Sequence, residues 1–170
     1  MKNLFVLLLL PSIFFFSCSD STEEDKAKII DLLYHNAECY RSKNLDCIMS
    51  TYLNDSSVIA LGTERNFIGR GWDAIRNIYK SDLSQNWTMI KYEYRNPIIN
   101  IHQDVSWLSA DVYSKIEVSL PDEYNEMQEI ELELDSRLTA VCKKVDGEWK
   151  FVLTNFQHFK NPAEVLVESK

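Results

Sequence analysis

The hydrophobic period of this 170-residue chain changes once, from helical spacing to the alternation of strands. Before the change, the pattern predicts three amphipathic helices, Glu23–Arg41, Leu45–Leu53 and Trp72–Leu83, and one short strand, Ser57–Leu61. After it, four long segments alternate: Trp87–His102, Val105–Val118, Glu129–Val145 and Glu148–Phe159. Helices followed by a run of hairpin-connected strands predict an α+β fold, in which the helices cover one face of a strongly curved, mostly antiparallel sheet.

Short polar segments separate the predicted strands. Gln103-Asp104 and Asp146-Gly147 have the composition of tight hairpin turns, whereas Pro121–Glu126 reads as a longer acidic loop. We expect Gly62–Gly71 to be a loop. Neither a glycine- or proline-rich linker nor an internal repeat divides the sequence, which predicts one domain over residues 26–160 and a tail over residues 161–170.

Both faces of the predicted sheet carry apolar residues. One face collects Leu108, Ala110, Val112, Ile116, Leu132, Leu134, Leu138, Ala140, Cys142, Val152, Thr154, Phe156 and His158. The opposite face holds Trp107, Tyr113, Val141, Trp149, Phe151 and Leu153. A sheet with one solvated face alternates more cleanly. We therefore expect a homodimer that pairs through the outer sheet face; the alternatives are a monomer with exposed aromatics and a C-terminal tail folded back over the sheet.

The N-terminus has the layout of a secretory signal. Lys2 precedes an apolar run, Leu4–Phe16, which is shorter than the roughly 20 residues that a stable membrane span needs. The run closes on Cys18 and so resembles a bacterial lipoprotein signal, with residues 1–17 removed and Cys18 lipidated. Residues 18–25 are then expected to be the lipidated cysteine and a solvated acidic tether. The alternative is an ordinary cleaved signal with a chance cysteine.

The charge balance restricts the partners of the chain. Acidic residues outnumber basic ones by 26 to 18, giving a net charge of −8. Without a basic stripe to neutralise phosphates, nucleic-acid binding is not expected. An acidic surface also disfavours electrostatic attachment to anionic lipid, which leaves the acyl chains on Cys18 as the membrane anchor. We expect a bacterial cell-envelope protein anchored to the outer membrane, facing either the periplasm or the cell surface.

The remaining cysteines and the histidines suggest no metal site. Cys39, Cys47 and Cys142 lack metal-site spacing, and the histidines, His35, His102 and His158, are scattered. Small buried thiols are the favoured interpretation. Cys39 and Cys47 flank a predicted helix–helix turn and could pair, but spacing alone does not test the geometry of a disulfide.

Four motifs, taken together, resemble the SnoaL-like domains of the nuclear transport factor 2-like superfamily. Asn44–Ile48 followed by Tyr52–Val58 is similar to the family's passage from helix to turn, helix and strand. Gly71–Arg76 resembles the family's next motif, in which a glycine precedes the third helix. Arg137–Val141 and Lys144–Val152 resemble its closing hairpin. Each motif is mostly structural, but their order and spacing are fairly specific.

The resemblance runs from about Ile29 to His158 and implies a cone of three N-terminal helices on a bent sheet, with a pocket in the open end. Such domains include isomerases, polyketide cyclases, dehydratases and plain binding modules, so the fold alone does not imply a reaction. In the ketosteroid-isomerase branch a pocket carboxylate abstracts a proton, and the matching residue here, Ala60, cannot do so. The tyrosine of that branch corresponds to Asn36, and an arginine of another branch to Ala140. We therefore expect no catalytic residue and no cofactor.

The resemblance leaves seven candidates for the pocket lining: Asn36, Tyr40, Tyr52, Trp72, Thr154, Phe156 and His158. Asn36 lies in an apolar helix stripe, and a buried amide needs a partner, either a ligand or the protein itself. The leading hypothesis is a lipid-anchored module that binds a small, mostly apolar ligand without catalysis. One alternative is an enzyme of the lyase or isomerase kind that uses His158 and Asn36. The other is a homodimeric interaction module.

Overall fold

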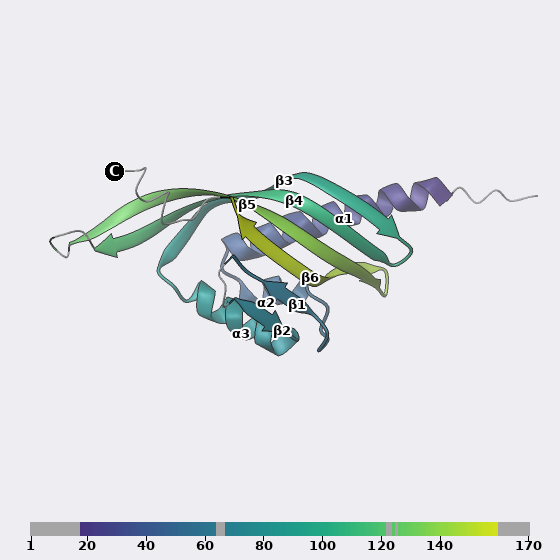
Figure 1. The fold of residues 1–170 in the computed structure, drawn as a ribbon, viewed down its shortest axis with the longest axis horizontal. Helices are drawn as coiled ribbons and strands as arrows, with labels where there is room; N and C mark the ends of the chain where they lie inside the picture. Colours follow the sequence, from purple (N-terminus) through teal and green to yellow (C-terminus); the bar gives the residue numbers. More distant parts are fainter. Residues whose placement is uncertain (1–17, 64–66, 122–123, 125, 160–170) are drawn as a thin grey trace, which may run out of the picture.

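A computed structural model describes residues 18–63, 67–121, 124 and 126–159 of the chain. The predicted signal, residues 1–17, and the predicted tail, residues 161–170, lie outside the described residues. The described part contains three helices and six strands: two strands lie between the second and third helices, and four follow the third (Figure 1). The predicted α+β class, with N-terminal helices on a curved sheet, is confirmed.

The first helix, α1 (Cys18–Arg41), begins earlier than the sequence predicts. Its buried stripe includes Asp25, Ile29, Leu33 and Asn36, at the three- and four-residue spacing that places side chains on one helix face. The expected acidic tether over residues 18–25 is therefore wrong: these residues form the first turns of α1. The composition predicts a solvated tether because a stretch without apolar residues has no side chains to bury.

The reason for the early start lies in the sheet. Asp25 accepts hydrogen bonds from Lys144 Nζ at 2.6 Å and from Trp149 Nε1 at 3.2 Å, both far along the chain. Burial by itself raises the pKa of Asp25, but the hydrogen bonds from Lys144 and Trp149 outweigh it and hold the pKa below its usual value. The carboxylate thus fastens the start of α1 to the sheet.

Replacing Asp25 with asparagine is expected to lower the free energy of unfolding at neutral pH by about 1–2 kcal/mol, because two charge-assisted hydrogen bonds are weakened. A carboxyl with a depressed folded-state pKa stabilises the fold above its unfolded pKa, and this contribution is lost as the pH falls through the folded value. The difference between variant and wild type should therefore shrink in acid, as measured by urea unfolding at several pH values. Asp31→Asn, at an exposed position of the same helix, is the control. A difference in unfolding free energy between wild type and Asp25→Asn that stays constant with pH would contradict the lowered pKa of Asp25.

The second helix is shorter than predicted and the third is as predicted. Helix α2 (Leu45–Ser50) begins after Asn44, whose side chain accepts from the backbone N–H of Cys47. It ends before the predicted Leu53 because the next residues pair with the sheet: the Leu53 N–H donates to the carbonyl of Phe151 at 3.0 Å. Helix α3 runs over the predicted span, Trp72–Leu83.

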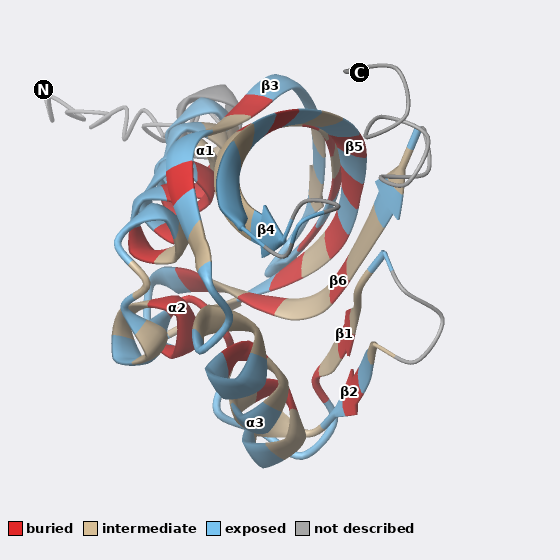
Figure 2. Cartoon of the chain, turned by 90° about the vertical axis from the view of Figure 1, so that its left-hand side faces the viewer, coloured by how far each residue is buried: buried red, intermediate tan, exposed pale blue. Residues whose placement is uncertain are grey.

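The six strands form one sheet in the order β2-β1-β6-β5-β4-β3. Their bounds are β1 Ile59–Leu61, β2 Ile68–Arg70, β3 Trp87–His102, β4 Val105–Pro121, β5 Met127–Val145 and β6 Glu148–His158. Only the β1–β6 pair is parallel among these described strands. Figure 2 shows how strongly β3, β4 and β5 curve, with the helices beside them. Strand β2 was not predicted; it lies in the expected loop and pairs with β1.

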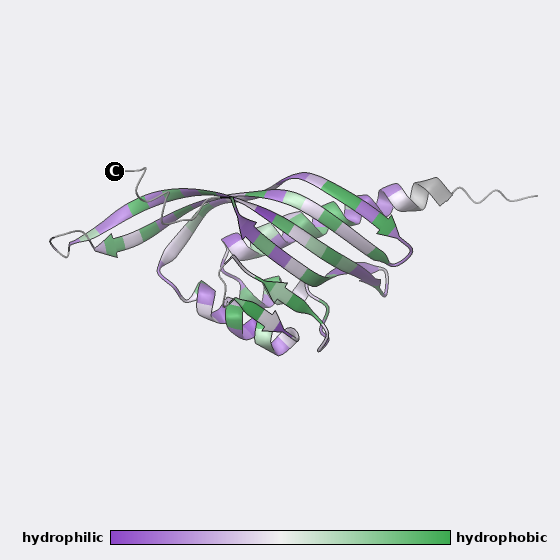
Figure 3. Ribbon diagram, viewed as in Figure 1, coloured by the Kyte–Doolittle hydropathy of each residue, from purple (hydrophilic) through white to green (hydrophobic). Residues whose placement is uncertain are grey.

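Both tight hairpins are confirmed. Asp146 and Gly147 have φ angles of 51° and 85°, the left-handed pair that a two-residue turn between twisted strands requires. Gln103, with φ 55°, turns the β3–β4 hairpin. The strands that follow each turn alternate in hydropathy (Figure 3), and the predicted inner face is buried on β4 and β5 at Leu108, Ala110, Val112, Leu132, Leu138, Ala140 and Cys142.

On β6 the predicted outer face is wrong for Trp149 and Phe151. Val141 pairs with Leu153, but the next residue, Cys142, pairs with Phe151, so β6 carries one extra residue at Val152. This bulge reverses the side-chain alternation on the hairpin side of Val152. Trp149 and Phe151 consequently point into the core, where 4% and 1% of their surfaces remain exposed, and the outer face is less aromatic than the sequence predicts.

The cysteines divide into a pair and a free thiol. Cys39 and Cys47 form a disulfide between α1 and α2, with a Cα–Cα distance of 5.3 Å. The expectation of buried free thiols is wrong for these two residues and holds for Cys142, which is free and buried. Burial raises the pKa of the Cys142 thiol to about 12, so it is an unreactive core residue.

Among the described helices, none is long and apolar enough to cross a bilayer.

Candidate functional site

Five tyrosines from four segments of the chain meet between the helices and the inner face of the sheet. They are Tyr40 of α1, Tyr52 after α2, Tyr79 of α3, and Tyr92 and Tyr94 of β3. Their ring centroids form a continuous series, Tyr94–Tyr92–Tyr40–Tyr79–Tyr52, at separations of 5.5, 5.2, 6.2 and 6.0 Å. These separations are those of favourable aromatic pairs. We refer to these residues as the tyrosine cluster.

The deepest polar groups of the cone bond to one another. Asn36 donates from Nδ2 to Thr51 Oγ1 at 3.0 Å and accepts from the Tyr94 hydroxyl at 2.9 Å. The Tyr52 hydroxyl lies 2.9 Å from both the Tyr79 hydroxyl and Thr154 Oγ1. All of these side chains are buried. The partner that the buried amide of Asn36 requires is thus supplied by the protein.

The end of α3 contributes a carboxylate to the cluster. Tyr40 donates its hydroxyl proton to Asp82 Oδ2 at 2.5 Å, and its ring stacks on Trp87 at 5.6 Å. Burial raises the pKa of Tyr40, and the negative charge of Asp82 and its hydrogen bond raise it further. Burial likewise raises the pKa of Tyr79 and of Tyr94. These phenols therefore remain protonated hydrogen-bond donors and do not act as bases.

His158 and Phe156 lie on the inner side of β6, toward its end. His158 Nδ1 is 2.8 Å from Ser136 Oγ, its cross-strand neighbour on β5, and both residues are at least partly buried. Phe156 packs at the border of the core. Asn36 and His158 thus make different contacts, the first with Thr51 and Tyr94, the second with Ser136.

Trp72 borders two hollows on the described surface. The larger, of about 620 Å³, lies between α2, the start of α3 and the β5–β6 turn. The smaller, of about 480 Å³, lies between the loop at Asn54–Ser56 and the start of α3. The larger one, here called the Trp72 hollow, is lined by Asp46, Met49, Ser50, Tyr52, Leu53, Asn54, Trp72, Arg76, Val145, Asp146, Glu148 and Lys150.

One family model matches most of the part of the chain that the structure describes. The SnoaL-like domain family matches residues 29–156. The chain belongs to this family. No curated protein matches it.

Solved structures of low identity share the fold of this SnoaL-like domain. A candidate scytalone dehydratase from Novosphingobium aromaticivorans has a TM-score of 0.70 at 13% identity, covering 84% of this chain and 89% of its own. A candidate dehydratase of the NTF2-like family from Streptomyces avermitilis has a TM-score of 0.67 at 11% identity, covering 82% and 99%. An NTF2-like superfamily protein from Salmonella enterica has a TM-score of 0.64 at 14% identity, covering 82% and 94%.

The seven predicted pocket residues lie in different parts of this SnoaL-like domain. Asn36 and Thr154 are buried within the hydrogen-bonded interior, and Tyr52 reaches from that interior to the Trp72 hollow. Tyr40 joins the tyrosine cluster, whereas Trp72 borders the hollows. Phe156 and His158 lie toward the end of β6. Ala60, where a related branch has its carboxylate, is buried on β1 opposite Thr154.

The sequence analysis missed several residues of this arrangement. Tyr92 and Tyr94 continue the even-numbered inner face onto β3, so extending the alternation by one strand finds them. No sequence pattern predicts that Asp82 would contact the tyrosine cluster or that Arg76 would line a hollow, because charged residues on a surface helix are ordinarily solvated. Lys150, beside the bulge, borders the Trp72 hollow and bonds to the carbonyl of Ser50 at 3.1 Å.

Proposed function

We propose that this SnoaL-like domain is a binding module that holds a small, mostly apolar molecule in the Trp72 hollow. The observation that carries the proposal is the hollow itself, whose volume of about 620 Å³ is in the range of small-molecule sites. The family supports ligand binding in general. The interior that the sequence analysis favoured supports it less, since its polar groups are buried and bonded to one another.

The lining of the hollow favours an apolar body with a polar end. Met49, Leu53, Trp72 and Val145 supply apolar surface. At the rim, Arg76 is paired with Asp46 at 2.7 Å and Lys150 with Glu148 at 2.7 Å, so both cations are already neutralised by neighbours. The Arg76 guanidinium also lies 5.5 Å from the Trp72 ring centroid. A flat apolar ligand would use the indole for contact and the rim for orientation.

A fluorescent naphthalene dye, 1-anilinonaphthalene-8-sulfonate, tests the hollow. Trp72→Ala is expected to weaken dye binding by at least about tenfold, because the largest apolar surface of the site is lost. Tyr34→Ala removes an aromatic ring that is 59% exposed on α1 and should leave binding unchanged. If Trp87→Ala abolishes binding while Trp72→Ala does not, the ligand lies with the tyrosine cluster and the proposal fails. Mass spectrometry of co-purifying molecules then identifies the natural ligand.

The enzyme alternative has less support. It requires Asn36 to donate to a bound substrate and His158 to move its proton. The amide of Asn36 already donates to Thr51, and the residue that corresponds to a catalytic carboxylate in a related branch is Ala60. Without a carboxylate at that position, the proton abstraction of the ketosteroid-isomerase branch has no base.

A second candidate function, self-association, is favoured by one row of residues on the outer sheet face. Trp107 pairs with Val141, Val141 with Leu153, and Leu153 with Ile59, so four apolar side chains cross four neighbouring strands. Trp107 is 49% exposed. A continuous apolar row of this kind suits a self-complementary contact between two copies of the chain.

Trp107→Asp is expected to convert a dimer into a monomer, because a carboxylate placed within an apolar contact is desolvated without a partner. Light scattering after size-exclusion chromatography measures the mass. Tyr34→Asp, on α1, serves as the control and should leave the mass unchanged. A wild-type chain that is monomeric at high micromolar concentration contradicts the proposal.

We also propose that Cys18 carries lipid and anchors the domain to the outer membrane of a bacterial cell envelope. The support is the sequence alone: a charged start, the apolar run Leu4–Phe16 and the cysteine that closes it. Because α1 begins at Cys18, the anchor would join the helix directly. Metabolic labelling with a fatty-acid analogue should mark the wild type and not Cys18→Ser, and membrane fractionation should release the variant. Labelling that persists in Cys18→Ser would contradict the anchor.

A further inference from the structure

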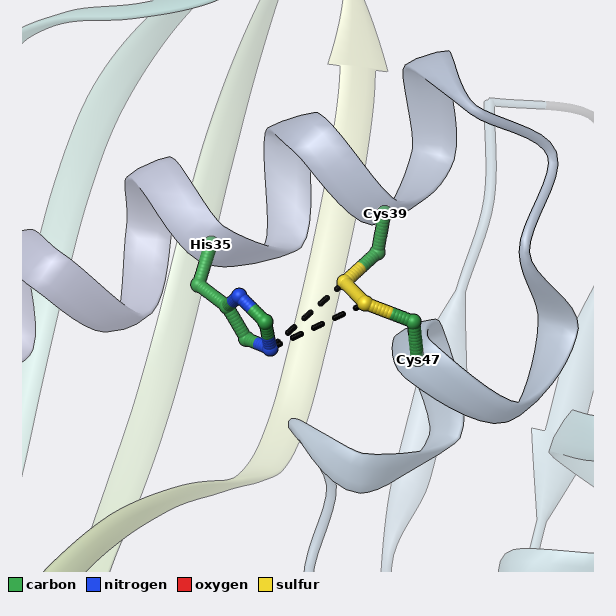
Figure 4. A group of neighbouring side chains, drawn as sticks. All are labelled: His35, Cys39 and Cys47. Carbon is green, nitrogen blue, oxygen red and sulfur yellow. Dashed lines mark hydrogen bonds between the residues drawn. A yellow bond between two sulfur atoms is a disulfide. The ribbon is translucent and has the colours of Figure 1, made fainter.

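A histidine lies against the disulfide that joins α1 to α2 (Figure 4). His35 and Cys39 are four residues apart on α1, which places both side chains on one face of the helix. Cys47 comes from the first turn of α2, where the side chain of Asn44 holds its backbone N–H at 3.1 Å. One nitrogen and two sulfur ligand atoms from two helices therefore meet at this corner, all within 4.8 Å of one another.

The distances resemble the edges of a metal coordination tetrahedron. His35 Nε2 lies 3.6 Å from Cys39 Sγ and 3.7 Å from Cys47 Sγ. With Zn–S bonds of about 2.3 Å and Zn–N bonds of about 2.0 Å, the ligand atoms of a tetrahedral site are about 3.5 Å apart for N···S and about 3.8 Å apart for S···S. The two N···S distances are thus already close to those of a metal site. Only the two sulfur atoms must separate.

Reduction permits that separation with little movement of the backbone. The Cα atoms of Cys39 and Cys47 are 5.3 Å apart, so small side-chain rotations can carry the sulfurs out of bonding distance. Cys39 is buried, Cys47 is half-buried and His35 is exposed. A cation held by these three ligands would therefore be covered on the Cys39 side and open to solvent at its fourth position.

We propose that reduction of the Cys39–Cys47 disulfide converts this corner into a three-ligand site for one thiophilic cation, with Zn²⁺ as the reference ion. In the first step a dithiol reductant donates two electrons and two protons to the S–S bond, which breaks to give two thiols while the reductant becomes a disulfide. In the second step Zn²⁺ binds both sulfurs and His35 Nε2, and the two thiol protons leave to solvent. Exchange with a second disulfide reverses the first step: that disulfide takes two electrons from the two thiolates and two protons from solvent and leaves as a dithiol, the Cys39–Cys47 bond re-forms and the cation is released, so binding is confined to the reduced chain.

The ligand set suits this chemistry. Thiolate and imidazole together are preferred by Zn²⁺ and by Cu⁺ over the hard cations that take oxygen ligands. Two thiolates also neutralise the charge of a divalent ion. Sequence spacing did not reveal the site, because its ligands come from one helical i,i+4 pair and the far side of a helix–helix turn rather than from a short cysteine–histidine motif.

Cobalt titration of the purified full chain tests the proposal, since Co²⁺ reports thiolate ligation by its absorption. After reduction with a phosphine, one equivalent of Co²⁺ should give a thiolate-to-cobalt charge-transfer band that Zn²⁺ removes, whereas the oxidised chain should give none. His35→Ala is expected to weaken binding at least tenfold, and Cys47→Ser to abolish the band. His102→Ala, at an exposed histidine in the β3–β4 hairpin, Cys18→Ser and Cys142→Ser should leave it intact.

Several results would overturn the proposal. A reduced wild type without the band has no such site, and equal binding by the oxidised chain places the metal elsewhere. Unchanged affinity in His35→Ala removes the imidazole from the ligand set. Circular dichroism is recorded on every reduced sample, because a chain that unfolds on reduction cannot present the three ligands and also refutes the proposal.

Discussion

Replacing Phe151 with alanine is expected to lower the free energy of unfolding by about 3–5 kcal/mol, the usual cost of truncating a fully buried phenylalanine. Phe151 is 1% exposed and packs against the Tyr52 ring at a centroid distance of 5.6 Å. Its backbone also binds the segment after α2, donating to Thr51 and accepting from Leu53. The substitution therefore leaves a cavity where α2, the sheet and the tyrosine cluster meet.

The same truncation at Phe159 provides a matched control. Phe159 follows β6 and is 53% exposed, so Phe159→Ala should change stability by less than about 1 kcal/mol. Chemical denaturation of both variants measures the difference. If side chains alternated along β6 without a bulge, Phe151 would lie on the outer face, and the two substitutions would lower the stability by similar amounts. Equal losses would therefore argue against the bulge at Val152.

Replacing Asn36 with aspartate is expected to cost about 3–5 kcal/mol at neutral pH, because it puts an ionisable carboxyl of nearly the same shape into the buried interior. Asn36 is 6% exposed. The Tyr94 hydroxyl can still donate to the new side chain, but the donor to Thr51 Oγ1 is lost. The Thr51 hydroxyl proton is already used by the carbonyl of Ile48, so it does not compensate.

The loss should depend on pH in a defined direction. Burial favours the neutral acid, so the pKa of the introduced carboxyl is higher in the folded state than in the unfolded state. The penalty is then smallest below the unfolded value near 4 and grows as the pH rises toward the folded value. Unfolding free energies from pH 3 to pH 8 (roughly the window that such a shift covers) measure it. Asn100→Asp, exposed on β3, is the control; a loss independent of pH would mean that solvent reaches position 36.

The interior of the cone bears on how this SnoaL-like domain should be understood. The position of a related branch's carboxylate holds Ala60, and Asn36 is bonded to Thr51 and Tyr94. Protonated phenols, one of them bonded to Asp82, occupy the space between helices and sheet. Such an interior stabilises the fold and donates hydrogen bonds, and its buried polar groups are already bonded to one another, which is why the proposed ligand site lies at the Trp72 hollow.

Local pattern determined much of the fold. The bounds of α3 and β3, and the turns at Gln103 and Asp146-Gly147, follow from period and turn chemistry within single segments. The alanine at position 60, where the resemblance implies a carboxylate in a related branch, is likewise read from the sequence. Where the seven predicted pocket residues lie, in the interior, at the Trp72 hollow or toward the end of β6, depends instead on contacts between separate elements.

What the sequence determined by itself is the α+β order and membership of the SnoaL-like family, because both are carried by patterns of residues close in the chain. The tertiary structure alone decided the facing of Trp149 and Phe151, the burial of Asp25 and the meeting of His35 with Cys39 and Cys47. Each of these depends on strand register or on contacts between separate elements. One extra residue in β6 moves the side chains of Trp149 and Phe151 from the outer face of the sheet to the inner face. The alternation of apolar and polar residues along the strand does not reveal this bulge.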